Sequence, residues 1–370
     1  MTRTRSSATW LAFAFALVVV YASLFPFTGW RVPPGGADSW LWLPWPAWFP
    51  RFDIVSNLLG YLPLGFLLYV AAVRSGWRAG GAFAASVAAS ALLSYMLEVL
   101  QQFLPARVPS LLDLALNAAG ATLGALAGAA LHGVGLLERW QSWRDRWFVR
   151  DSAGAIALLL LWPLGLLFPT PVPLGLGQVW DEARGWVLAA LAGTPWLEPA
   201  QAFLALPPGA VPRPSLLVEA MAVALGLLVP CLIAYTVTHP GGRRLVLAAG
   251  AVGVAVGTMT LASAMNYGPD NAFAWWTPSV GPGLVGALAA ALLCLPLGRR
   301  LVAGVALVAL TALVAVVSMA PTDAYYAHNL QGWQQGRFIR FHGLAQWVGW
   351  FWPYVALGWL LSRLGRPGAA

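Results

Sequence analysis

Two segments in the first third of the chain carry an acid and an amide at the same spacing. Both read D-x3-N-x2-G, with Asp53 and Asn57 in the first segment and Asp113 and Asn117 in the second. Residues four apart lie on one face of a helix, so each predicted helix presents a carboxylate and an amide on a single stripe. These groups can hydrogen-bond to a polar ligand or to a neighbouring helix.

Glycines accompany both segments. Gly60 and Gly120 follow the asparagines by about one turn, and Gly124 and Gly128 continue the second series at four-residue spacing. Because a glycine has no side chain, a neighbouring helix can approach it closely. The sequence therefore predicts close helix packing beside both acid–amide stripes.

A further group of polar residues lies near the end of the apolar segment between the two repeats. Glu98, Gln101 and Gln102 share one helix face, and Arg107 follows in the turn. A charged carboxylate at the centre of a membrane-spanning helix costs about 2.5–3.5 kcal/mol, and less near the helix end. Glu98 must therefore be paired, protonated or hydrated, and Arg107 is the nearest cation in the sequence.

These polar residues have two interpretations. A network of ion pairs would lock the first helices together, whereas a site open to one side of the membrane would bind a polar or charged ligand. Ionisable residues inside a membrane are usually functional, which favours a ligand site for the acids and the arginine. Asparagines more often join helices by hydrogen bonds. The predicted cluster comprises Asp53, Asn57, Glu98, Gln102, Arg107, Asp113 and Asn117.

A secondary candidate group lies before the last apolar segment. Arg337, Arg340 and His342 stand among aromatic residues and could hold a phosphate or a carboxylate. Arginines that reach lipid headgroups give the same pattern, and we favour that anchoring role.

Other residue types that often carry chemistry show no such pattern. His132, His239 and His328 have no metal-ligand spacing and are interpreted as ordinary loop residues, and Cys231 and Cys294 lie in apolar runs where a disulfide is not expected. Motifs for a nucleophile elbow, a phosphate loop or a metalloprotease do not occur. No catalytic residue, metal or cofactor is therefore predicted.

The elements that must position the cluster are apolar. Of the 370 residues, 59% are hydrophobic and only 9% are charged, against about 25% charged residues in soluble proteins. Ten apolar segments are long enough to cross a bilayer as helices. They span residues 9–27, 54–73, 80–103, 111–131, 153–170, 215–237, 244–264, 279–297, 301–320 and 344–362. We predict an all-α, polytopic transmembrane bundle of about ten spans.

The arginines predict how this bundle is oriented. All 21 basic residues are arginine, and a cytoplasmic N-terminus puts fourteen of them on the cytoplasmic side, in agreement with the positive-inside rule. An even number of spans then returns the C-terminus to the cytoplasm. The predicted cluster falls at the outer ends of the first four spans. The net charge of +8 is thus a topology signal, and nucleic-acid binding is not expected.

The charge distribution also predicts three parts of the chain. Residues 1–135 form a four-helix membrane domain, residues 136–152 a basic cytoplasmic linker, and residues 153–370 a second membrane domain of about six spans. In this last part, apolar residues recur at helical spacing from Val179 to Leu191. That spacing predicts a short amphipathic helix in the outer interface, and an aromatic-rich outer loop precedes the last span.

The order of the polar residues resembles the VanZ-like family of bacterial membrane proteins. The residues that carry the resemblance are Asp53, Asn57 and Pro63-Leu-Gly65, then Glu98, Gln102 and Arg107, then Asp113, Asn117 and Gly120. The resemblance covers about residues 9–132, and the second half resembles no family that we recognise. It implies a multi-pass protein of the bacterial inner membrane with a role in the cell envelope. Because the family is named for a glycopeptide-resistance accessory protein, it also implies a role in antibiotic resistance.

Three functions are compatible with these residues. The resemblance and the outward cluster favour non-catalytic binding of a polar or lipid-linked cell-wall molecule, with membrane lipids as further partners. The two D-x3-N-x2-G segments begin at the same side of the membrane and so form a parallel repeat. Such a repeat is also compatible with a transporter, although transport sites usually lie near the midplane. The third is an intramembrane enzyme that uses Glu98 or Asp113 as acid or base on a lipid-linked substrate. The sequence does not indicate an oligomeric state.

Overall fold

The protein is all-helical in the part of the chain that the structure describes. The computed structural model describes residues 7–25, 27–33, 41–48, 51–149, 151–168, 170, 172–204, 215–318 and 339–365. No β-strand occurs among these residues, which confirms the all-α part of the predicted fold class. The chain divides into two compact units, Met1–Ala157 and Leu158–Ala370.

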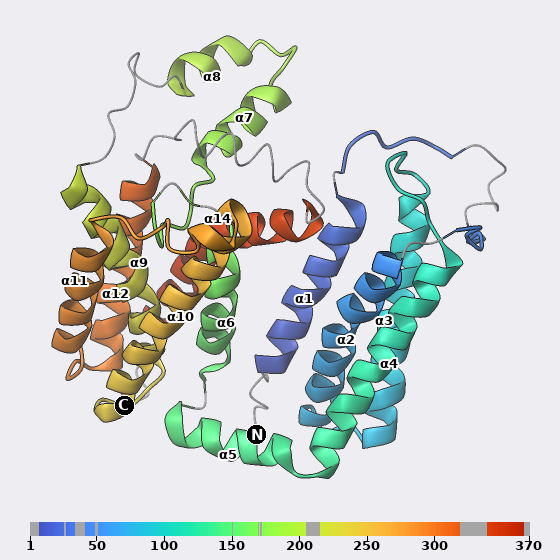
Figure 1. Cartoon of the computed structure of the whole chain (residues 1–370), viewed down its shortest axis with the longest axis horizontal. Helices are drawn as coiled ribbons and strands as arrows, with labels where there is room; N and C mark the ends of the chain where they lie inside the picture. Colours follow the sequence, from blue (N-terminus) through green and yellow to red (C-terminus); the bar gives the residue numbers. More distant parts are fainter. Residues whose placement is uncertain are drawn as a thin grey trace. The chain divides into compact units, whose positions relative to one another are not determined.

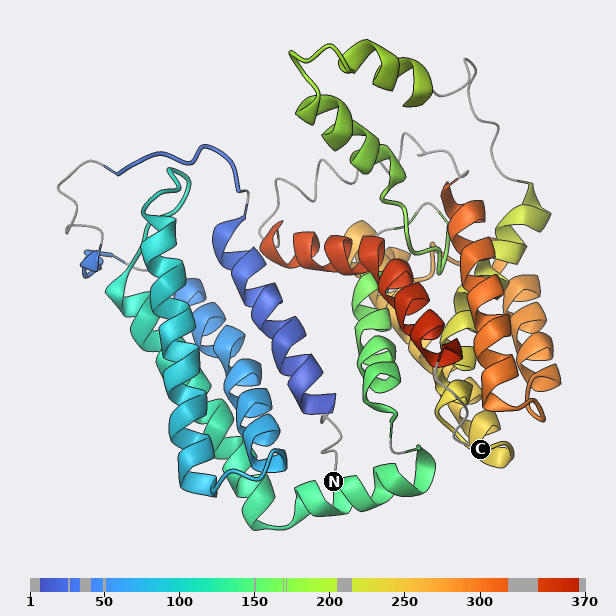
Figure 2. The same cartoon turned by 180° about the vertical axis from the view of Figure 1, so that it is seen from behind.

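The first unit is a bundle of long helices (Figure 1). It contains α1 (Ser7–Leu24), α2 (Arg51–Arg74), α3 (Ala79–Gln101), α4 (Leu111–Gly133) and α5 (Leu136–Trp147). Short turns join α2 to α3 and α3 to α4, so α3 runs opposite to α2 and α4. In both views, α5 runs across the direction of α2, α3 and α4 at one end of the bundle (Figure 2).

α2 and α4 run in the same direction and pack backbone to backbone. A Cβ built on Gly120 would lie 2.1 Å from the carbonyl oxygen of Leu58, and one on Gly124 would lie 1.9 Å from that of Leu62. Small residues permit this approach, and the predicted glycine seam of α4 is confirmed. Gly60, in contrast, has open space around it, so the prediction of close packing at that glycine is wrong.

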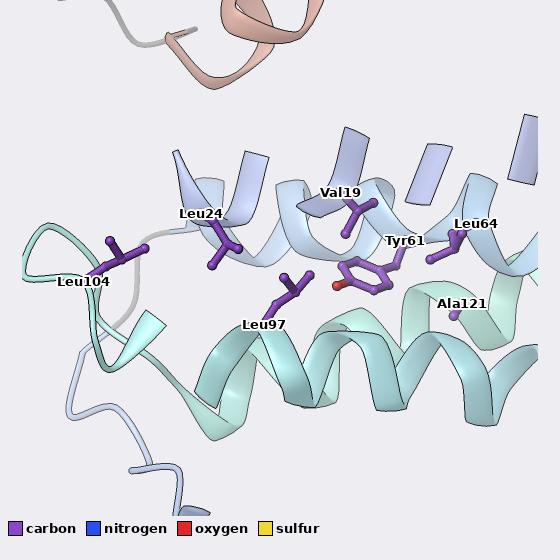
Figure 3. Close-up of a cluster of buried hydrophobic side chains, with 7 residues drawn as sticks. All are labelled: Val19, Leu24, Tyr61, Leu64, Leu97, Leu104 and Ala121. Atoms are coloured by element: carbon purple, nitrogen blue, oxygen red, sulfur yellow. The ribbon is translucent and has the colours of Figure 1, made fainter. Parts of the chain in front are cut away.

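A buried apolar cluster joins α1 to the other helices of this bundle (Figure 3). Its members are Val19, Leu24, Tyr61, Leu64, Leu97, Leu104 and Ala121. In the figure, Leu24 lies beside Leu97, and Val19 lies above the ring of Tyr61. Because lipid is as apolar as these side chains, close packing rather than exclusion of water holds such helices together in a membrane.

The second unit is built around one central helix, α9 (Leu216–Thr236). α6 (Ala153–Leu166) begins before the boundary between the units and continues into this half. The other elements of this half are α7 (Trp180–Ala190), α8 (Leu197–Leu204), α10 (Gly242–Tyr267), the 3-10 turn η2 (Pro269–Asn271), α11 (Val280–Leu293), α12 (Arg299–Ser318) and α14 (Ile339–Leu364). α9 packs against α10, α11 and α12. Residues 226–236 of α9 are all buried, so this helix forms the core of the unit.

The residues just before the predicted amphipathic helix belong to that core. Leu174 and Leu176 are fully buried, and the backbone N–H of Gly177 donates to the carbonyl oxygen of Gly349 at 2.9 Å. Pro and Gly break the helix in this stretch, but its leucines still fill space inside the unit. The short helix predicted from Val179 onward is confirmed as α7.

Each of the ten predicted apolar segments coincides with a helix. Among the described residues, six helices are long and apolar enough to cross a membrane by length and composition: Asp53–Arg74, Ala79–Gln101, Leu111–Gly133, Leu216–Thr236, Gly242–Tyr267 and Arg299–Ser318. The segments Ala8–Leu24, Ala153–Leu166 and Val280–Leu293 are shorter apolar helices. These features fit a multi-pass membrane protein. A total of about ten spans, the inner-membrane location and the cytoplasmic placement of both termini stay predictions.

Candidate functional site

Three helix ends meet at one end of the first bundle, which we call the Glu98 end. α2 and α4 begin there, and α3 stops there, so Asp53, Glu98 and Asp113 all lie in a terminal turn of a helix. Acids in the first turn of a helix interact favourably with its positive N-terminal end, which applies to Asp53 and Asp113. The topology therefore gathers the predicted acids at one end of the bundle.

Glu98 is buried and holds α3 to the start of α4. Its residue surface is 4% exposed, and its Oε2 accepts a hydrogen bond from the backbone N–H of Ser110 at 2.9 Å. Ser110 is in turn the N-cap of α4, because its hydroxyl oxygen accepts hydrogen bonds from the N–H groups of Leu112 and Asp113. A buried carboxylate requires such donors to offset its lost hydration.

The two acid–amide segments make different contacts. The Nδ2 of Asn57 donates to Oδ1 of Asp113 at 2.7 Å, which joins α2 to α4. Asn117 does not make the equivalent bond, because its Nδ2 donates to the hydroxyl oxygen of Ser94 on α3 at 2.9 Å. Both asparagines thus connect helices, as such side chains commonly do in membranes.

Asp53 has a more open environment than Glu98. It is half-buried in the first turn of α2, and its backbone carbonyl accepts a hydrogen bond from the hydroxyl of Ser56. Within the described ranges, no hydrogen bond or ion pair involves its carboxylate. Both carboxylate oxygens of Asp53 can therefore accept hydrogen bonds from a ligand.

Arg107 connects the turn after α3 to α1. Its Nη2 donates to the carbonyl oxygen of Ala22 at 3.0 Å and to that of Phe25. A guanidinium group near the last carbonyls of a helix is favourable, because these oxygens have no partner within the helix. The predicted ion pair between Arg107 and Glu98 stays a prediction.

An aromatic segment, residues 41–48, is fastened to the Glu98 end. Three of its backbone carbonyl groups accept hydrogen bonds from α3, the turn after it and the first residue of α4: Leu41 from the Tyr95 hydroxyl, Trp42 from the Gln102 amide and Pro44 from the Leu111 N–H. Trp42, Trp45 and Trp48 are 78%, 64% and 77% exposed. Exposed tryptophans beside polar groups suit the boundary between lipid and water.

A row of serines on α3 was not predicted from the sequence. Ser86, Ser90 and Ser94 precede Glu98 at four-residue intervals, and all four side chains are buried. The hydroxyl of Ser90 has no hydrogen-bond partner among the described residues. The interval itself was visible in the sequence and indicates a polar stripe on one helix face.

His132 was also misinterpreted. It lies in α4, where its Nδ1 is 3.1 Å from the hydroxyl of Tyr69, and its Nε2 is 3.5 Å from a carboxylate oxygen of Glu138. The expectation of an ordinary loop residue is therefore wrong, because His132 connects α2, α4 and α5 at the opposite end of the bundle.

The secondary candidate group falls outside what the structure describes. Arg337 lies outside the described residues, and so do the side chains of Arg340 and His342. In the described part, no group of three or more His, Cys, Asp and Glu residues could hold a metal ion. Cys231 and Cys294 are separate, buried thiols.

The Asn57–Asp113 hydrogen bond can be tested by a double-mutant cycle. We expect Asn57→Ala and Asp113→Ala to be coupled by about 0.6–1.7 kcal/mol, the range of hydrogen bonds between membrane helices. The free energy of unfolding in mixed micelles measures this coupling for the two single variants and the double variant. Additive losses would contradict the bond, and the pair Asn57→Ala and Ser75→Ala serves as the uncoupled control.

The N-terminal third of the chain is similar to a known protein family. Residues 2–132 match the family model described as VanZ/LLP1. The match confirms the resemblance for the N-terminal segment, which holds the whole cluster at the Glu98 end. Comparisons with curated proteins and with solved structures give no match.

Proposed function

We propose that the first unit binds the polar head of a lipid-linked cell-envelope molecule at its Glu98 end. The observation that carries this proposal is the junction of three features: the half-buried Asp53, the Gln102 side chain and the exposed tryptophans of residues 41–48. The polar groups would bind the head of the ligand, and the apolar surroundings would take its chain.

An amphiphilic ligand fits the surface around these groups. Val55 and Leu59 on α2 and Leu100 on α3 are exposed close to the Glu98 end. A water-soluble ligand would not bind to these exposed apolar side chains. A ligand that remains in the membrane can contact both the polar groups and the apolar side chains. The tryptophan side chains add flat apolar faces on which the rings of sugars can stack.

The side of the membrane on which the ligand would bind is inferred from the arginines. Their distribution predicts that the Glu98 end faces away from the cytoplasm, where lipid-linked cell-wall precursors and glycopeptide antibiotics are found. The VanZ/LLP1 match over residues 2–132 supports an envelope role of this type.

Binding to defined lipids tests the proposal. The purified full chain would be titrated with a polyprenyl-phosphate-linked saccharide, with polyprenyl phosphate alone and with a zwitterionic phospholipid, and complexes would be counted by native mass spectrometry. We expect Asp53→Asn and Gln102→Ala to weaken binding of the saccharide-bearing lipid by roughly tenfold to a hundredfold, because hydrogen bonds to charged groups contribute about 1.5–3 kcal/mol.

A matched variant separates loss of the site from a general charge effect. Glu198→Gln removes an exposed acid of the second unit and should leave binding unchanged. In cells, Glu98→Gln or Arg107→Ala should alter glycopeptide or detergent sensitivity at normal protein levels. Equal binding of all three lipids by the wild-type protein would overturn the proposal.

A second candidate function, transport, is favoured by the serine row of α3. Ser86, Ser90 and Ser94 extend the polar character of Glu98 toward the interior of the bundle, as a path for protons or a polar substrate requires. The acids nevertheless lie in terminal turns, whereas transport sites usually lie near the midplane. Proton uptake by proteoliposomes that is lost in Ser90→Ala would favour transport over binding.

A further inference from the structure

α5 has an unusual position for a segment predicted to be a linker. It runs across the direction of α2, α3 and α4 (Figures 1 and 2), whereas helices that cross a membrane run along it. Its Leu137 packs on the buried cluster at the ends of α2 and α4, and Glu138 contacts His132. If α2, α3 and α4 span the membrane, α5 lies along the membrane surface.

The side chains of α5 fall into three stripes. Leu136, Trp140, Trp143 and Trp147 recur at four-, three- and four-residue intervals, which places them on one face. The rings of Trp140 and Trp143 are stacked at 5.0 Å, and those of Trp143 and Trp147 lie 5.4 Å apart. Trp140 and Trp143 are nevertheless 49% and 42% exposed.

Charged residues are ordered around this aromatic face. Arg139 and Arg146 are exposed and lie three or four residues from Trp143, on one flank of the aromatic stripe. Glu138 and Asp145 are seven residues apart and lie on the opposite side of the helix. The cations thus stand at the edge between the apolar and polar faces, and the acids point away from it.

Tryptophans flanked by arginines indicate the kind of surface that α5 can bind. Tryptophan rings occupy the headgroup boundary of a bilayer, and arginines beside them can reach phosphate groups with paired N–H donors. Arg74, at the end of α2, lies close enough to Arg144 and Asp145 to interact electrostatically with them. This end of the bundle therefore carries more cations than α5 alone supplies.

We propose that α5 is an interfacial helix that binds the phosphate headgroups of anionic phospholipids in the leaflet at its own end of the bundle. The occupant is a lipid rather than a protein, because the arginines flank the tryptophans instead of forming a separate patch. This site lies at the opposite end from the cluster around Glu98 and is independent of the function proposed for that cluster.

Lipid titration of the full chain tests the charge requirement. Native mass spectrometry would follow binding of phosphatidylglycerol and phosphatidylcholine to the wild-type protein and to the Arg139→Gln/Arg146→Gln variant. We expect the variant to lose roughly thirty-fold in affinity for phosphatidylglycerol, since each arginine near an anionic surface contributes about 1 kcal/mol. Binding of phosphatidylcholine should not change, and added salt should weaken only the phosphatidylglycerol complex.

The control removes the same charge from the other end of the unit. Arg31 and Arg51 are exposed near the Glu98 end, and the Arg31→Gln/Arg51→Gln variant should keep wild-type affinity for phosphatidylglycerol. If both double variants lose affinity equally, the effect is one of net charge, and the proposal is wrong.

Spin labels placed on α5 in the otherwise wild-type protein give a measurement that does not depend on the arginine variants. Labels at Leu136→Cys and Ser142→Cys would report the aromatic and polar faces of α5, and the native Cys231 and Cys294 are buried. In phosphatidylglycerol bilayers, we expect the label at 136 to meet oxygen from the lipid phase and the label at 142 to meet a water-soluble nickel chelate. The proposal would be overturned if the chelate reached both labels. It would also be overturned if neither oxygen nor the chelate reached the label at position 136.

Discussion

Gly65→Ala is expected to destabilise the first bundle strongly, although alanine is the better helix former. A Cβ at this position would lie 2.0 Å from the carbonyl oxygen of Ala121 and 2.7 Å from its Cα. Both atoms belong to the backbone of α4 and cannot rotate away, so α2 and α4 must separate. Overpacking of this kind costs about 1–3 kcal/mol and sometimes more, which exceeds the gain of about 1 kcal/mol in helix propensity.

The same helix provides the control for this substitution. Gly60 has no atom within 4 Å of an added Cβ, so Gly60→Ala should be neutral or slightly stabilising. Unfolding of the purified protein in mixed detergent micelles, followed by circular dichroism, measures both variants against the wild type. Gly124→Ala tests the α4 side of the seam and should resemble Gly65→Ala. Equal stability of Gly65→Ala and Gly60→Ala would show that α2 and α4 do not pack backbone to backbone.

Separation of α2 and α4 should also change the geometry of the candidate site. The Asn57–Asp113 hydrogen bond spans these two helices two turns away from Gly65. Gly65→Ala is therefore expected to weaken binding of the lipid-linked ligand, whereas Gly60→Ala, which lies closer to Asn57 in sequence, is not. This reversed order distinguishes helix separation from a local effect of the added methyl group.

Much of the first unit could be predicted because its signals are local. Apolar length predicted the helices, and four-residue spacing predicted the glycine seam of α4 and the stripes that carry Asp53 and Asp113. The partners of these groups depend on how far one helix is shifted along the next, which no local pattern fixes. For this reason the repeat did not reveal that Asn57 meets Asp113, whereas Asn117 meets Ser94 of α3.

Three features of the fold were not predicted from charge and proline content. The predicted basic linker, residues 136–152, contains the helix α5, which its tryptophan spacing indicates. Proline and glycine interrupt residues 172–177, yet Leu174 and Leu176 are buried. Arg244 lies in the first turn of α10, and its buried surroundings depend on contacts far away in the sequence.

Arg244 is the largest fully buried side chain among the described residues of the second unit, and its removal is expected to loosen that unit. It is 0% exposed. The two Nη groups of its guanidinium donate to five backbone carbonyl oxygens, so at least one N–H is shared between two acceptors: the carbonyls are those of Tyr235 and Thr238 at the end of α9, and of Cys294, Leu295 and Leu297 after α11. The carbonyl groups at the end of a helix lack partners within it. Arg244 supplies those partners for two helices at once.

Arg244→Gln should lower the free energy of unfolding by about 3–5 kcal/mol, because several buried carbonyl groups lose their donor and each unsatisfied group costs about 1–3 kcal/mol. A glutamine side chain has two N–H donors and leaves most of the carbonyls without a partner. Arg244→Lys keeps the charge but offers three donors on one atom, so it should restore only part of the loss. The neighbouring Arg243 is exposed, and Arg243→Gln is the control that should change little.

The native cysteines report this change without any added label. Cys231 on α9 and Cys294 after α11 are both buried, and buried thiols react slowly because reagents cannot reach them. If Arg244 fastens the ends of α9 and α11, maleimide should label Cys294 much faster in Arg244→Gln than in Arg243→Gln. Cys231 lies inside α9, further from the lost hydrogen bonds, and should respond less. Unchanged labelling of Cys294 together with unchanged unfolding would mean that the carbonyls find other donors, and Arg244 would then be dispensable for holding the two helices together.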